Sequence, residues 1–445
     1  MTSPTVELLQ TLIRNQCVND GTPASGHEYR SVESIAEFLG AQGTLFEPVA
    51  GRQSSIYRIP GTAPGAPALM LMGHTDVVPV NRDGWSIDPF AAEIADGYVW
   101  GRGAIDMLNL TASMATVFRR YLTGELDPLP GDLVFLAVAD EENSGTYGAH
   151  PLVRDRWDLV HCDYLLTEIA YPPITTAAGI GYPVNVAEKG PHWTRLTAQG
   201  TPGHGSVPYG ADNAIAPMVD ALAGVFRTPA PVVITDVWRS FVETLGFPDD
   251  RRDALLDPDR VDEEIDAMAV EDPRFAAYVH ACTHLTVSPN VFEGGIKANI
   301  VPEHAEAQID LRALPGQSRE DVDQYLRKAM GAAGARIDLH PMADHEASAS
   351  PPGNPLWDTI VDSIEHHTGT RRIVPTITPA ATDARFFRER GVVAYGVGLF
   401  DERIAFPDFL SMFHGHDERV SVQSADLTTA LLETLLEGWR GRTSP

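Results

Sequence analysis

Three apolar runs, each followed closely by side chains that can bind a metal ion, constrain this chain more than any other feature of its sequence. The runs and those side chains are 69–72 with His74 and Asp76, 133–138 with Glu141 and Glu142, and 164–167 with Glu168. Continuous apolar runs of this length are typical of strands buried on both faces, as in a parallel sheet. Parallel strands end at one edge of their sheet, where ligands bind in open α/β folds. One such acid is typical of a solvated strand end, but three strand ends of this kind predict a shared site.

Length and composition indicate a large globular protein. A chain of 445 residues exceeds what one ordinary core holds, so we expect two domains. Its composition, 43% apolar and 21% charged, is that of a soluble protein. No apolar run approaches the roughly 20 residues that span a bilayer, and the N-terminus lacks a signal-peptide pattern. Cys17, Cys162 and Cys282 suit neither a disulfide framework nor a thiolate metal site, so we expect a cytoplasmic protein.

The formal net charge of −28 narrows the range of partners. So acidic a surface repels nucleic acid and anionic membranes, and we expect neither as a partner. Solubility is a simpler explanation of the charge than an acidic-partner role. An anionic substrate would need a local cation, so isolated arginines near the predicted site become candidates for binding it.

The first half of the chain has the pattern of an α/β domain. Residues 28–39 have helical periodicity, and 54–59 alternate as a strand. After a region rich in turn residues, a helix is predicted over 107–122, which places Asp106 in a loop at a helix start. A Gly-x-Gly sequence before it suggests a dinucleotide fingerprint. That interpretation fails because no buried strand directly precedes it and Asp106 replaces the third glycine.

The organisation changes near residue 190. The predicted elements there are a strand at 193–198, a helix at 213–226, a charged helical insertion at 236–282, strands near 283–292 and 305–312, a helix from 318 to about 333 and a strand at 335–340. Apart from the insertion, this order is the ferredoxin-like pattern of a small independent domain. We therefore predict a large α/β domain with a mostly parallel central sheet flanked by helices, interrupted by a ferredoxin-like α+β domain. The predicted boundaries are 1–187 and 343–445 for the large domain and 188–342 for the inserted one.

The predicted strand ends supply the ligand types of a pair of divalent metal ions. Imidazole nitrogen and carboxylate oxygen both bind first-row ions at roughly 2.0–2.2 Å. Two ions roughly 3.5–4 Å apart need one bridging carboxylate and further ligands on each ion. Asp76, two residues after His74, is placed to orient that imidazole. On an extended segment Glu141 and Glu142 would point opposite ways, one toward a metal and the other toward a water as general base.

A second histidine ligand must come from elsewhere in the chain. The segment His414-Gly415-His416-Asp417-Glu418 is the richest candidate, and spacing alone leaves both His414 and His416 open. The remaining histidines outside the motifs lack acidic strand-end context and are interpreted as surface or core residues.

Five motifs, in this order, resemble the dizinc aminoacylase/carboxypeptidase family of metallopeptidases. They are Gly73-His74-Thr75-Asp76-Val77-Val78-Pro79, Gly101-Arg102-Gly103-Ala104-Ile105-Asp106-Met107, Asp140-Glu141-Glu142, Gly203-His204-Gly205-Ser206 and Thr382-Asp383-Ala384-Arg385. The family includes aminoacylase, glutamate carboxypeptidase, succinyl-diaminopimelate desuccinylase, acetylornithine deacetylase and carnosinase. The C-terminal His-Gly-His-Asp-Glu-Arg-Val motif is most similar to the carboxypeptidase S-like and N-acyl-amino-acid hydrolase branch. Each motif is weak alone, but the set is specific and spans nearly the whole chain.

The resemblance implies a role for each residue of the predicted metal site. The implied ligands are His74 and Glu168 on the first ion, Glu142 and His414 on the second, and Asp106 as the bridge between them. A cis peptide often follows the bridging aspartate in this family. The family's last ligand lies four residues before a glutamate, which selects His414 because Glu418 follows it. Glu141 is implied as the general base and Asp76 as the partner that supports His74.

The resemblance also implies that the inserted domain is a lid and dimerisation domain. His204 matches a histidine that crosses a dimer interface to stabilise the oxyanion. Asn299 and Arg312 match contacts to the substrate carboxylate, and Asp383 is implied as a further substrate-binding residue. Without the resemblance, His204 would be interpreted as a turn residue and Arg312 as part of a salt bridge. Leu108 departs from the family, which usually has a lysine there, but it is not a metal ligand.

The predicted function is that of a two-metal amidohydrolase that cleaves a dipeptide or N-acyl amino acid with a free carboxylate. We expect two divalent ions per subunit, zinc in the first place with cobalt or manganese as alternatives, and a homodimer formed through the inserted domain. One alternative is a metal-dependent aminopeptidase that requires a free N-terminus. The other is a non-catalytic binding protein on the same scaffold, which the retention of Glu141 beside every candidate ligand disfavours.

Overall fold

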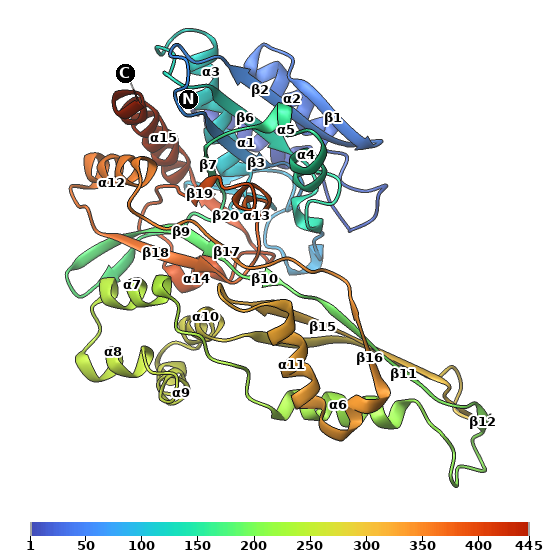
Figure 1. Cartoon of the computed structure of the whole chain (residues 1–445). Coiled ribbons are helices and arrows are strands. Elements are labelled where there is room, and N and C mark those ends of the chain that lie inside the picture. The colour runs from blue at the N-terminus through green and yellow to red at the C-terminus, as the bar shows by residue number, and fades with distance from the viewer. Residues whose placement is uncertain (1, 444–445) are drawn as a thin grey trace.

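The computed structural model describes residues 2–443 and consists of a large α/β body and an arm that extends from it (Figure 1). The sheet of the body has the strand order β1-β2-β6-β3-β7-β19-β9-β17, with β8 and β18 also paired to β9. The bounds are β1 (Thr44–Val49), β2 (Arg52–Ile59), β3 (Leu69–His74), β6 (Leu133–Val138), β7 (Tyr164–Thr167), β8 (Ile174–Thr176), β9 (Gly179–Glu188), β17 (Ser348–Ala349), β18 (Ile373–Thr378) and β19 (Val393–Gly396). No helix within residues 2–443 is both long and apolar enough to cross a membrane.

The centre of this sheet is parallel, as predicted. Strand β3 pairs in parallel with β6 and β7, and β19 pairs in parallel with β7. Antiparallel pairs flank this centre, β1 with β2 on one side and β9 with β19 on the other. The register sets His74 opposite Val138 and Leu71 opposite Leu166, so β3, β6 and β7 end at the same edge. The predicted fold class is confirmed, and the three apolar runs are its central strands.

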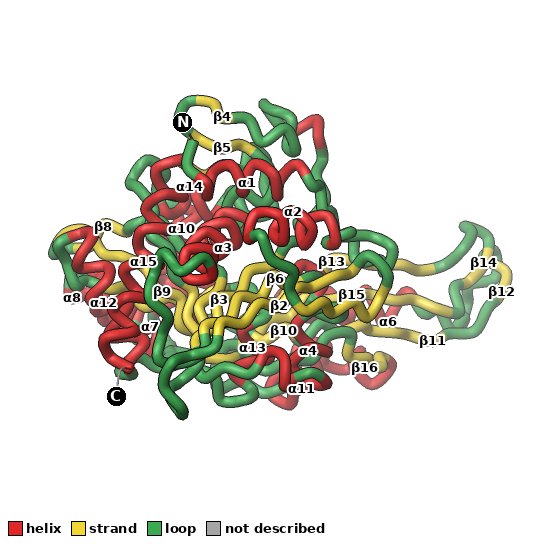
Figure 2. The backbone as a smooth tube through the Cα atoms, turned by 90° about the horizontal axis from the view of Figure 1, so that it is seen from above, coloured by secondary structure: helices red, strands yellow, loops and turns green. Residues whose placement is uncertain are grey.

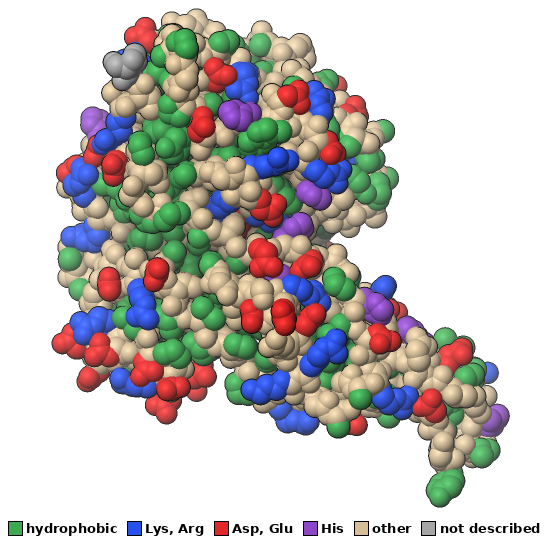
Figure 3. Space-filling view, in the orientation of Figure 1, with side chains coloured by type: hydrophobic (Ala, Val, Ile, Leu, Met, Phe, Trp, Pro, Cys, Tyr) green, Lys and Arg blue, Asp and Glu red, His purple; other side chains and the backbone are tan. Residues whose placement is uncertain are grey.

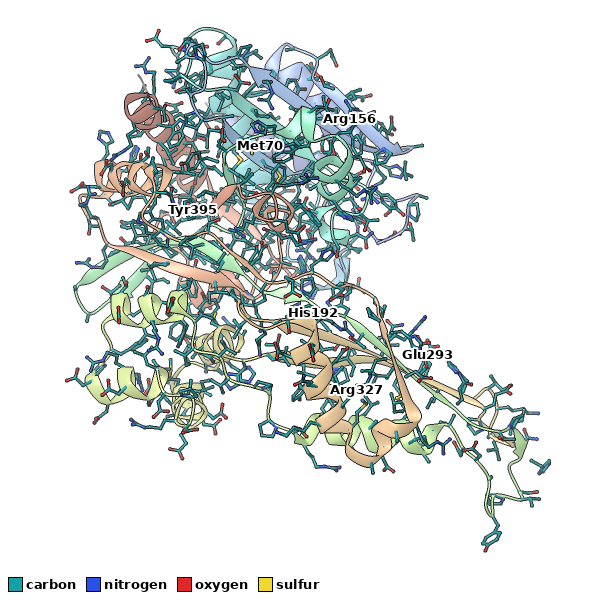
Figure 4. All side chains as sticks on the ribbon, viewed as in Figure 1. Met70, Arg156, His192, Glu293, Arg327 and Tyr395 are labelled. Atoms are coloured by element: carbon teal, nitrogen blue, oxygen red, sulfur yellow. The ribbon has the colours of Figure 1, made fainter. Side chains whose placement is uncertain are left out.

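The apolar runs are continuous because alternate side chains enter two different cores. Leu69 and Leu71 belong to the larger core, and Met70 and Met72 belong to a second one on the other face (Figure 4 labels Met70 inside the body). Helices of the larger core include α1 (Pro4–Arg14), α2 (Tyr29–Leu39), α3 (Leu108–Leu122), α12 (Pro355–Thr368) and α15 (Val422–Thr443), whereas α4 (Ala149–Asp155) and α13 (Ala384–Arg388) contribute to the second. Successive side chains of a strand point to opposite faces, so a strand covered on both faces must be apolar throughout.

Gly73 interrupts the first apolar run because helix α3 approaches the strand closely there. A Cβ at this position would lie 2.3 Å from Thr111 Oγ1 and 3.1 Å from Thr111 Cα. The Thr111 hydroxyl donates a hydrogen bond to the main-chain carbonyl of His74 at 2.9 Å. The absence of a side chain therefore lets α3 hold the end of β3, where the first predicted metal ligand lies.

The arm has the ferredoxin-like topology that the sequence predicts. Its sheet has the order β16-β11-β15-β13, with antiparallel pairing throughout. The bounds are β11 (Thr194–Gln199), α6 (Ile215–Arg227), β13 (Thr286–Gly294), β15 (His304–Ala313), α11 (Arg319–Met330) and β16 (Ile337–Pro341), with the short β10 (Gly190–Pro191) paired to β15. The two helices pack on the sheet through an apolar core of their own.

The far end of the arm is an exposed apolar tip. A short ribbon of β12 (Gly203–His204) and β14 (Ile300–Val301) forms it, and Figure 2 shows this ribbon projecting beyond the rest of the molecule. Tyr209 is fully exposed, and Val207 and Ile296 are 70% and 89% exposed. The space-filling view shows apolar side chains at this end (Figure 3). The tip therefore presents apolar surface to solvent, far from the core of the body.

The helical insertion packs on the body although it lies within the predicted inserted domain. Its helices are α7 (Asp236–Leu245), α8 (Asp249–Leu255), α9 (Val261–Glu271) and α10 (Pro273–Thr283). Trp238, Phe241 and Val279 are buried in the larger core of the body, and α7 lies against β18. The division at 187/188 and 342/343 stays a prediction, and the packing associates these four helices with the body.

The segment that first leaves the body for the arm contacts the segment that finally returns from it. His192 lies at the junction of the two parts (Figure 4), and its Nδ1 is 2.7 Å from the carboxylate of Asp344 on the returning segment. This contact ties the outgoing and returning segments together where the arm leaves the body.

Candidate metal centre

The ends of the central strands, the loop before α3 and a loop near the C-terminus bring the five predicted metal ligands together. His74 Nε2 lies 3.2 Å from Asp106 Oδ1 and 3.9 Å from Glu168 Oε2. His414 Nε2 lies 3.3 Å from Asp106 Oδ2 and 3.1 Å from Glu142 Oε2. Asp106 thus turns one carboxylate oxygen toward each imidazole. All five predicted ligands belong to one cluster, and their individual roles stay predictions.

The donor set of this cluster fits a pair of divalent ions. Ligand atoms of His74, Glu141 and Glu168 lie within 4.8 Å of one another, and so do those of His74, Asp106 and Glu142. Within the described residues, Glu142 Oε1 is buried and has no hydrogen-bond partner. A buried carboxylate oxygen without a partner is costly unless a cation binds it. Imidazole and carboxylate are donors that zinc and similar ions take.

Burial and mutual repulsion shift the pKa values of the acids in the cluster. Burial raises the pKa of Glu141 and of Glu168 well above the usual range, and neighbouring carboxylates add to both shifts. Burial raises the pKa of Glu142 as well. Burial acts in the same direction on Asp106, but hydrogen bonds from the two imidazoles bring the pKa of Asp106 below its usual range. A bound divalent cation would favour the charged form of every acid in this cluster.

Glu141 and Glu142 diverge because they lie on a helical turn, so the expectation of an extended segment was wrong. Asp140 has a left-handed φ of +69°, and a short 3-10 turn begins immediately after it. The main-chain N–H groups of Glu141 and Glu142 donate to the carboxylate of Asp76 at 3.2 and 3.1 Å. With three residues per 3-10 turn, adjacent side chains point about 120° apart. The two glutamates can therefore serve different functions.

Asp76 supports His74 through its main chain more than through its carboxylate. His74 Nδ1 lies 2.9 Å from the main-chain oxygen of Asp76 and 3.7 Å from its carboxylate. An Nδ1 beside a carbonyl is the protonated nitrogen, which leaves Nε2 free to bind a metal. The Asp76 carboxylate instead accepts from Asn19 Nδ2 at 2.8 Å and from the N–H groups of the glutamate turn.

A buried network behind Asp76 was missed by the sequence analysis. Asn19 also donates to Asp140 at 3.0 Å, and Arg52 Nη2 lies 2.5 Å from the same carboxylate oxygen. Arg52 in turn pairs with Glu28 at 2.8 Å, and both side chains are fully buried. Asn19, Glu28 and Arg52 match none of the motifs and are far from Asp140 in sequence, so no local pattern could reveal their contacts.

Glu418 holds the loop that ends in Asp106, a role that its spacing from His414 does not reveal. Its buried carboxylate accepts from Arg102 Nη1 at 2.7 Å and from the main-chain N–H groups of Ile105 and Asp106 at 2.8 and 3.1 Å. The Asp106–Met107 peptide that follows is cis, as the resemblance implies. Both partners lie in segments that the sequence analysis quoted, Arg102 before Asp106 and Glu418 after His414. Their opposite charges were the one sequence signal that could have suggested this contact.

His414 and not His416 belongs to the cluster. The ring of His416 lies against Gly84, where an added Cβ would meet Cε1 of His416 at 2.4 Å. The position of His414 at the cluster is consistent with the ligand that the resemblance implies, and its role as a ligand stays a prediction.

Not all predicted substrate residues lie at the cluster. His204 and Asn299 are exposed at the tip of the arm, where the Gly205 N–H donates to the Asn299 carbonyl at 2.9 Å. Asp383 is buried, its carboxylate has no hydrogen-bond partner within residues 2–443, and burial raises its pKa to about 7. Arg312 lies at the cavity beside the cluster, with its Nε bonded to Asp310 at 3.1 Å. The roles of these four residues stay predictions.

A cavity of about 770 Å³ opens between the cluster and the arm, a size that suits a small-molecule ligand. Its lining from the body includes Asp106, Glu141, Glu142, Glu168 and His414, and its lining from the arm includes Pro191, Trp193, Thr286 and Arg312. The cluster therefore faces a space that both parts of the molecule enclose.

Arg385 is a further cation of this cavity that the sequence analysis quoted in a motif but did not select. Its guanidinium donates to the main-chain oxygens of Thr382 and Ser144 at 2.6 and 3.1 Å. Its Nε is buried without a hydrogen-bond partner among the residues that the structure describes. Arg385, two residues beyond Asp383, lines the cavity, whereas Asp383 is not part of the lining.

Known proteins are similar to this chain in sequence or in fold. It is 26% identical over 441 residues to aminoacylase-1 of Mus musculus, a match that covers 97% of this chain and 95% of that protein. The M20 family metallo-carboxypeptidase Sso-CP2 from Sulfolobus solfataricus has a similar structure, with a TM-score of 0.74, 18% identity and coverage of 98% and 99%. Human carnosine dipeptidase 1 aligns with a TM-score of 0.69, 15% identity and coverage of 98% and 96%. At these identities the two structures show a shared fold.

A family model defines the relationship. The model described as Peptidase family M20/M25/M40 matches residues 70–438, a segment that contains the five clustered ligands and the whole arm. The resemblance drawn from the motifs is therefore confirmed, and so is the predicted enzyme class of metal-dependent hydrolases of amide bonds. This chain belongs to peptidase family M20/M25/M40.

Proposed function

We propose that this protein is a two-metal amidohydrolase that cleaves a dipeptide or an N-acyl amino acid with a free carboxylate. The observation that supports this most is the position of Asp106 between His74 and His414, with Glu142 and Glu168 on either side. These five residues would hold two divalent ions, zinc in the first place with cobalt or manganese as alternatives. Such ions polarise the scissile carbonyl and supply a nucleophile from water at neutral pH.

Residues of the protein would transfer the proton, position the general base and bind the substrate carboxylate. Glu141 takes the proton of the attacking water and returns it to the leaving amine, as a general base and then a general acid. Asp76 fixes the turn that aims Glu141, because its carboxylate accepts the main-chain N–H of that residue. Arg312 provides a cation at the cavity for the substrate carboxylate. Asp383, behind the cavity, and Asn299, from the tip of a second subunit's arm, are proposed as further substrate-binding residues. The likeness to a protein named aminoacylase-1 supports an N-acyl amino acid as substrate.

We expect the purified enzyme to lose activity on treatment with a chelator and to regain it when zinc, cobalt or manganese is added back. The clustered acids repel one another without cations, so the melting temperature should fall together with the activity. The measurements are metal content by elemental analysis, thermal unfolding, and hydrolysis of matched dipeptides and N-acyl amino acids. A mock treatment without chelator serves as the control.

The same set of dipeptides and N-acyl amino acids distinguishes the proposed amidohydrolase from an aminopeptidase and from a non-catalytic binding protein. Cleavage of free dipeptides that is abolished by acylating their amine would favour the aminopeptidase. Two bound metals without turnover of any substrate would favour the non-catalytic binding protein. Activity that persists at a metal content near zero would contradict the proposed chemistry.

We also propose that the enzyme is a homodimer, in which His204 and Asn299 act on the partner's substrate. Both residues are exposed at the tip of the arm, beside the apolar side chains of Val207, Tyr209 and Ile296. A second copy would cover this apolar surface and bring the tip toward the partner's cavity. From there the His204 imidazole would stabilise the oxyanion of the tetrahedral intermediate.

Mixed dimers test this arrangement. We expect Glu141→Gln and His204→Ala to be nearly inactive alone and to recover about a quarter of wild-type activity when mixed 1:1, since half of the twofold dimers then have one complete site. The measurement is the specific activity after the two variants exchange subunits. Mixing each variant with itself is the control. No recovery, in subunits shown to exchange, would place His204 in its own subunit's site or give it a structural role.

A further inference from the structure

The last helix of the insertion turns one face into the active-site cavity. Arg274, Ala277, Tyr278 and Ala281 of α10 recur at the spacing i, i+3, i+4 and i+7, which places them on a single face. All four line the cavity that contains the metal cluster. Ala277 and Ala281 are not buried by the protein, so their small side chains leave the space in front of the helix open.

Aromatic side chains border the same space. Tyr171, Tyr278 and Phe413 line the cavity, and Leu410 at the end of α14 (Phe406–Leu410) joins them. Phe406 links the rings, with centroid distances of 5.2 Å to both Tyr171 and Tyr278. The ring of Phe413 lies 6.4 Å from that of Tyr171. One side of the cavity is therefore an apolar wall backed by a packed aromatic cluster.

This wall adjoins the proposed metal ligands directly. Tyr171 follows Glu168 by three residues, and Phe413 immediately precedes His414. Arg312 instead lies on the arm, with its guanidinium 5.9 Å above the ring of Trp193. A substrate whose amide is at the metal cluster would place the groups next to its scissile carbonyl beside this wall, because Tyr171 and Phe413 line the same cavity as the ligands that they adjoin in sequence.

The positively charged residue on this face of α10, Arg274, already forms an ion pair. Arg274 lies at the rim of the cavity in an ion pair with Asp408 of α14. A second carboxylate, such as that of a succinyl group, would have to compete with Asp408 for this guanidinium. The other residues that α10 contributes to the cavity are two alanines and one tyrosine, whose hydroxyl donates to the main-chain oxygen of Ile377 at 3.2 Å. An apolar group fits this wall better than a charged one.

We propose that Tyr171, Ala277, Tyr278, Ala281, Leu410 and Phe413 form an acyl pocket that makes the enzyme selective for N-acyl amino acids with a large apolar acyl group. This inference rests on the proposed amidohydrolase function and specifies its substrate. The insertion, which the sequence alone left without a function, thereby contributes the wall that distinguishes acyl groups. Each methylene buried against this wall should raise kcat/KM roughly threefold or more until the pocket is full.

The test uses the metal-loaded enzyme and a series of N-acyl-alanines with acetyl, butyryl, hexanoyl, octanoyl and succinyl groups. For the wild type we expect kcat/KM to rise from acetyl to the longer chains, with succinyl-alanine cleaved less well than hexanoyl-alanine. Ala277→Trp should fill the acyl pocket and lower kcat/KM for octanoyl-alanine about tenfold or more, while the value for acetyl-alanine changes about threefold or less. If the tryptophan variant does not fold, Ala277→Val replaces it in the test and should give a smaller loss of kcat/KM for octanoyl-alanine.

Ala267→Trp is the matched control, because Ala267 is exposed on the neighbouring helix α9 and does not line the cavity. This variant should have the wild-type kcat/KM for every N-acyl-alanine in the series. Equal losses for acetyl-alanine and octanoyl-alanine in the Ala277 variants, or a wild type without preference for long chains, would overturn the acyl pocket. Failure to hydrolyse any member of the series or any dipeptide would instead contradict the proposed function, so the two failures are distinguishable.

Discussion

Replacing Glu141 with glutamine is expected to lower kcat by about 100-fold or more and to leave two metal ions bound. General acid–base steps contribute roughly 10²- to 10⁴-fold in rate, and glutamine cannot accept the proton of the attacking water. The side chain keeps nearly the same shape, and the main-chain N–H of residue 141 can still donate to Asp76. Steady-state kinetics, together with elemental analysis of the purified variant, measure the two quantities.

Glu293→Gln is a matched control, since Glu293 is an exposed residue of β13. It should leave kcat and metal content unchanged. A Glu141→Gln enzyme with wild-type kcat would contradict the assigned role. A variant that loses one ion would instead make Glu141 a metal ligand, a position that its distance from His74 and Glu168 would permit.

The central strands could be predicted from the sequence because a strand that is buried on both faces consists of consecutive apolar residues. Leu69 to Met72 are all apolar since helices cover both faces of β3, and Gly73 records the close approach of α3. The order of the parallel strands then places His74 and Glu168 at one edge without further information. The ferredoxin-like order of the arm was predictable for a similar reason, because each of its strands and helices has a clear periodicity of its own.

Other parts of the site depend on contacts between distant segments, which no local pattern records. The extended segment expected for Glu141 and Glu142 is a 3-10 turn, because the carboxylate of Asp76 accepts two main-chain N–H groups there. The contacts of Glu418 to the loop before Asp106 join residues more than 300 positions apart. Propensity and periodicity act within a few residues, so such contacts become visible only in the folded chain.

The helical insertion is the clearest case of a function hidden by local analysis. The sequence predicts a charged and mostly helical segment, and helices α7 to α10 confirm that it is helical. Its position is set by apolar residues such as Trp238 and Phe241, which join the core of the body and so bring α10 to the cavity. Because this packing is a tertiary contact, the sequence could locate the helices but not the wall that they form.

Replacing Asp106 with asparagine is expected to lower activity at least as much as Glu141→Gln does, but through loss of bound metal. Asp106 is the only residue described here that contacts both imidazoles of the cluster, His74 at 3.2 Å and His414 at 3.3 Å. Asparagine keeps the shape of the side chain but replaces one anionic oxygen with an NH₂ group, which cannot bind a cation. Loss of an outer partner of a ligand already costs 10- to 100-fold in metal affinity or activity, so loss of the bridge should cost roughly 100-fold or more.

The variant should therefore bind fewer than two ions per chain, whereas Glu141→Gln should retain both, and this difference separates the bridging role from the role of the general base. Elemental analysis after dialysis and titration with zinc measure the stoichiometry, and thermal unfolding with and without zinc measures the stabilisation by bound metal. Asp266→Asn, at an exposed position of α9, should behave as the wild type. If Asp106→Asn bound two ions with unchanged affinity, Asp106 would not be the bridge, and the contact between His414 and Glu142 would have to define the second ion site without it.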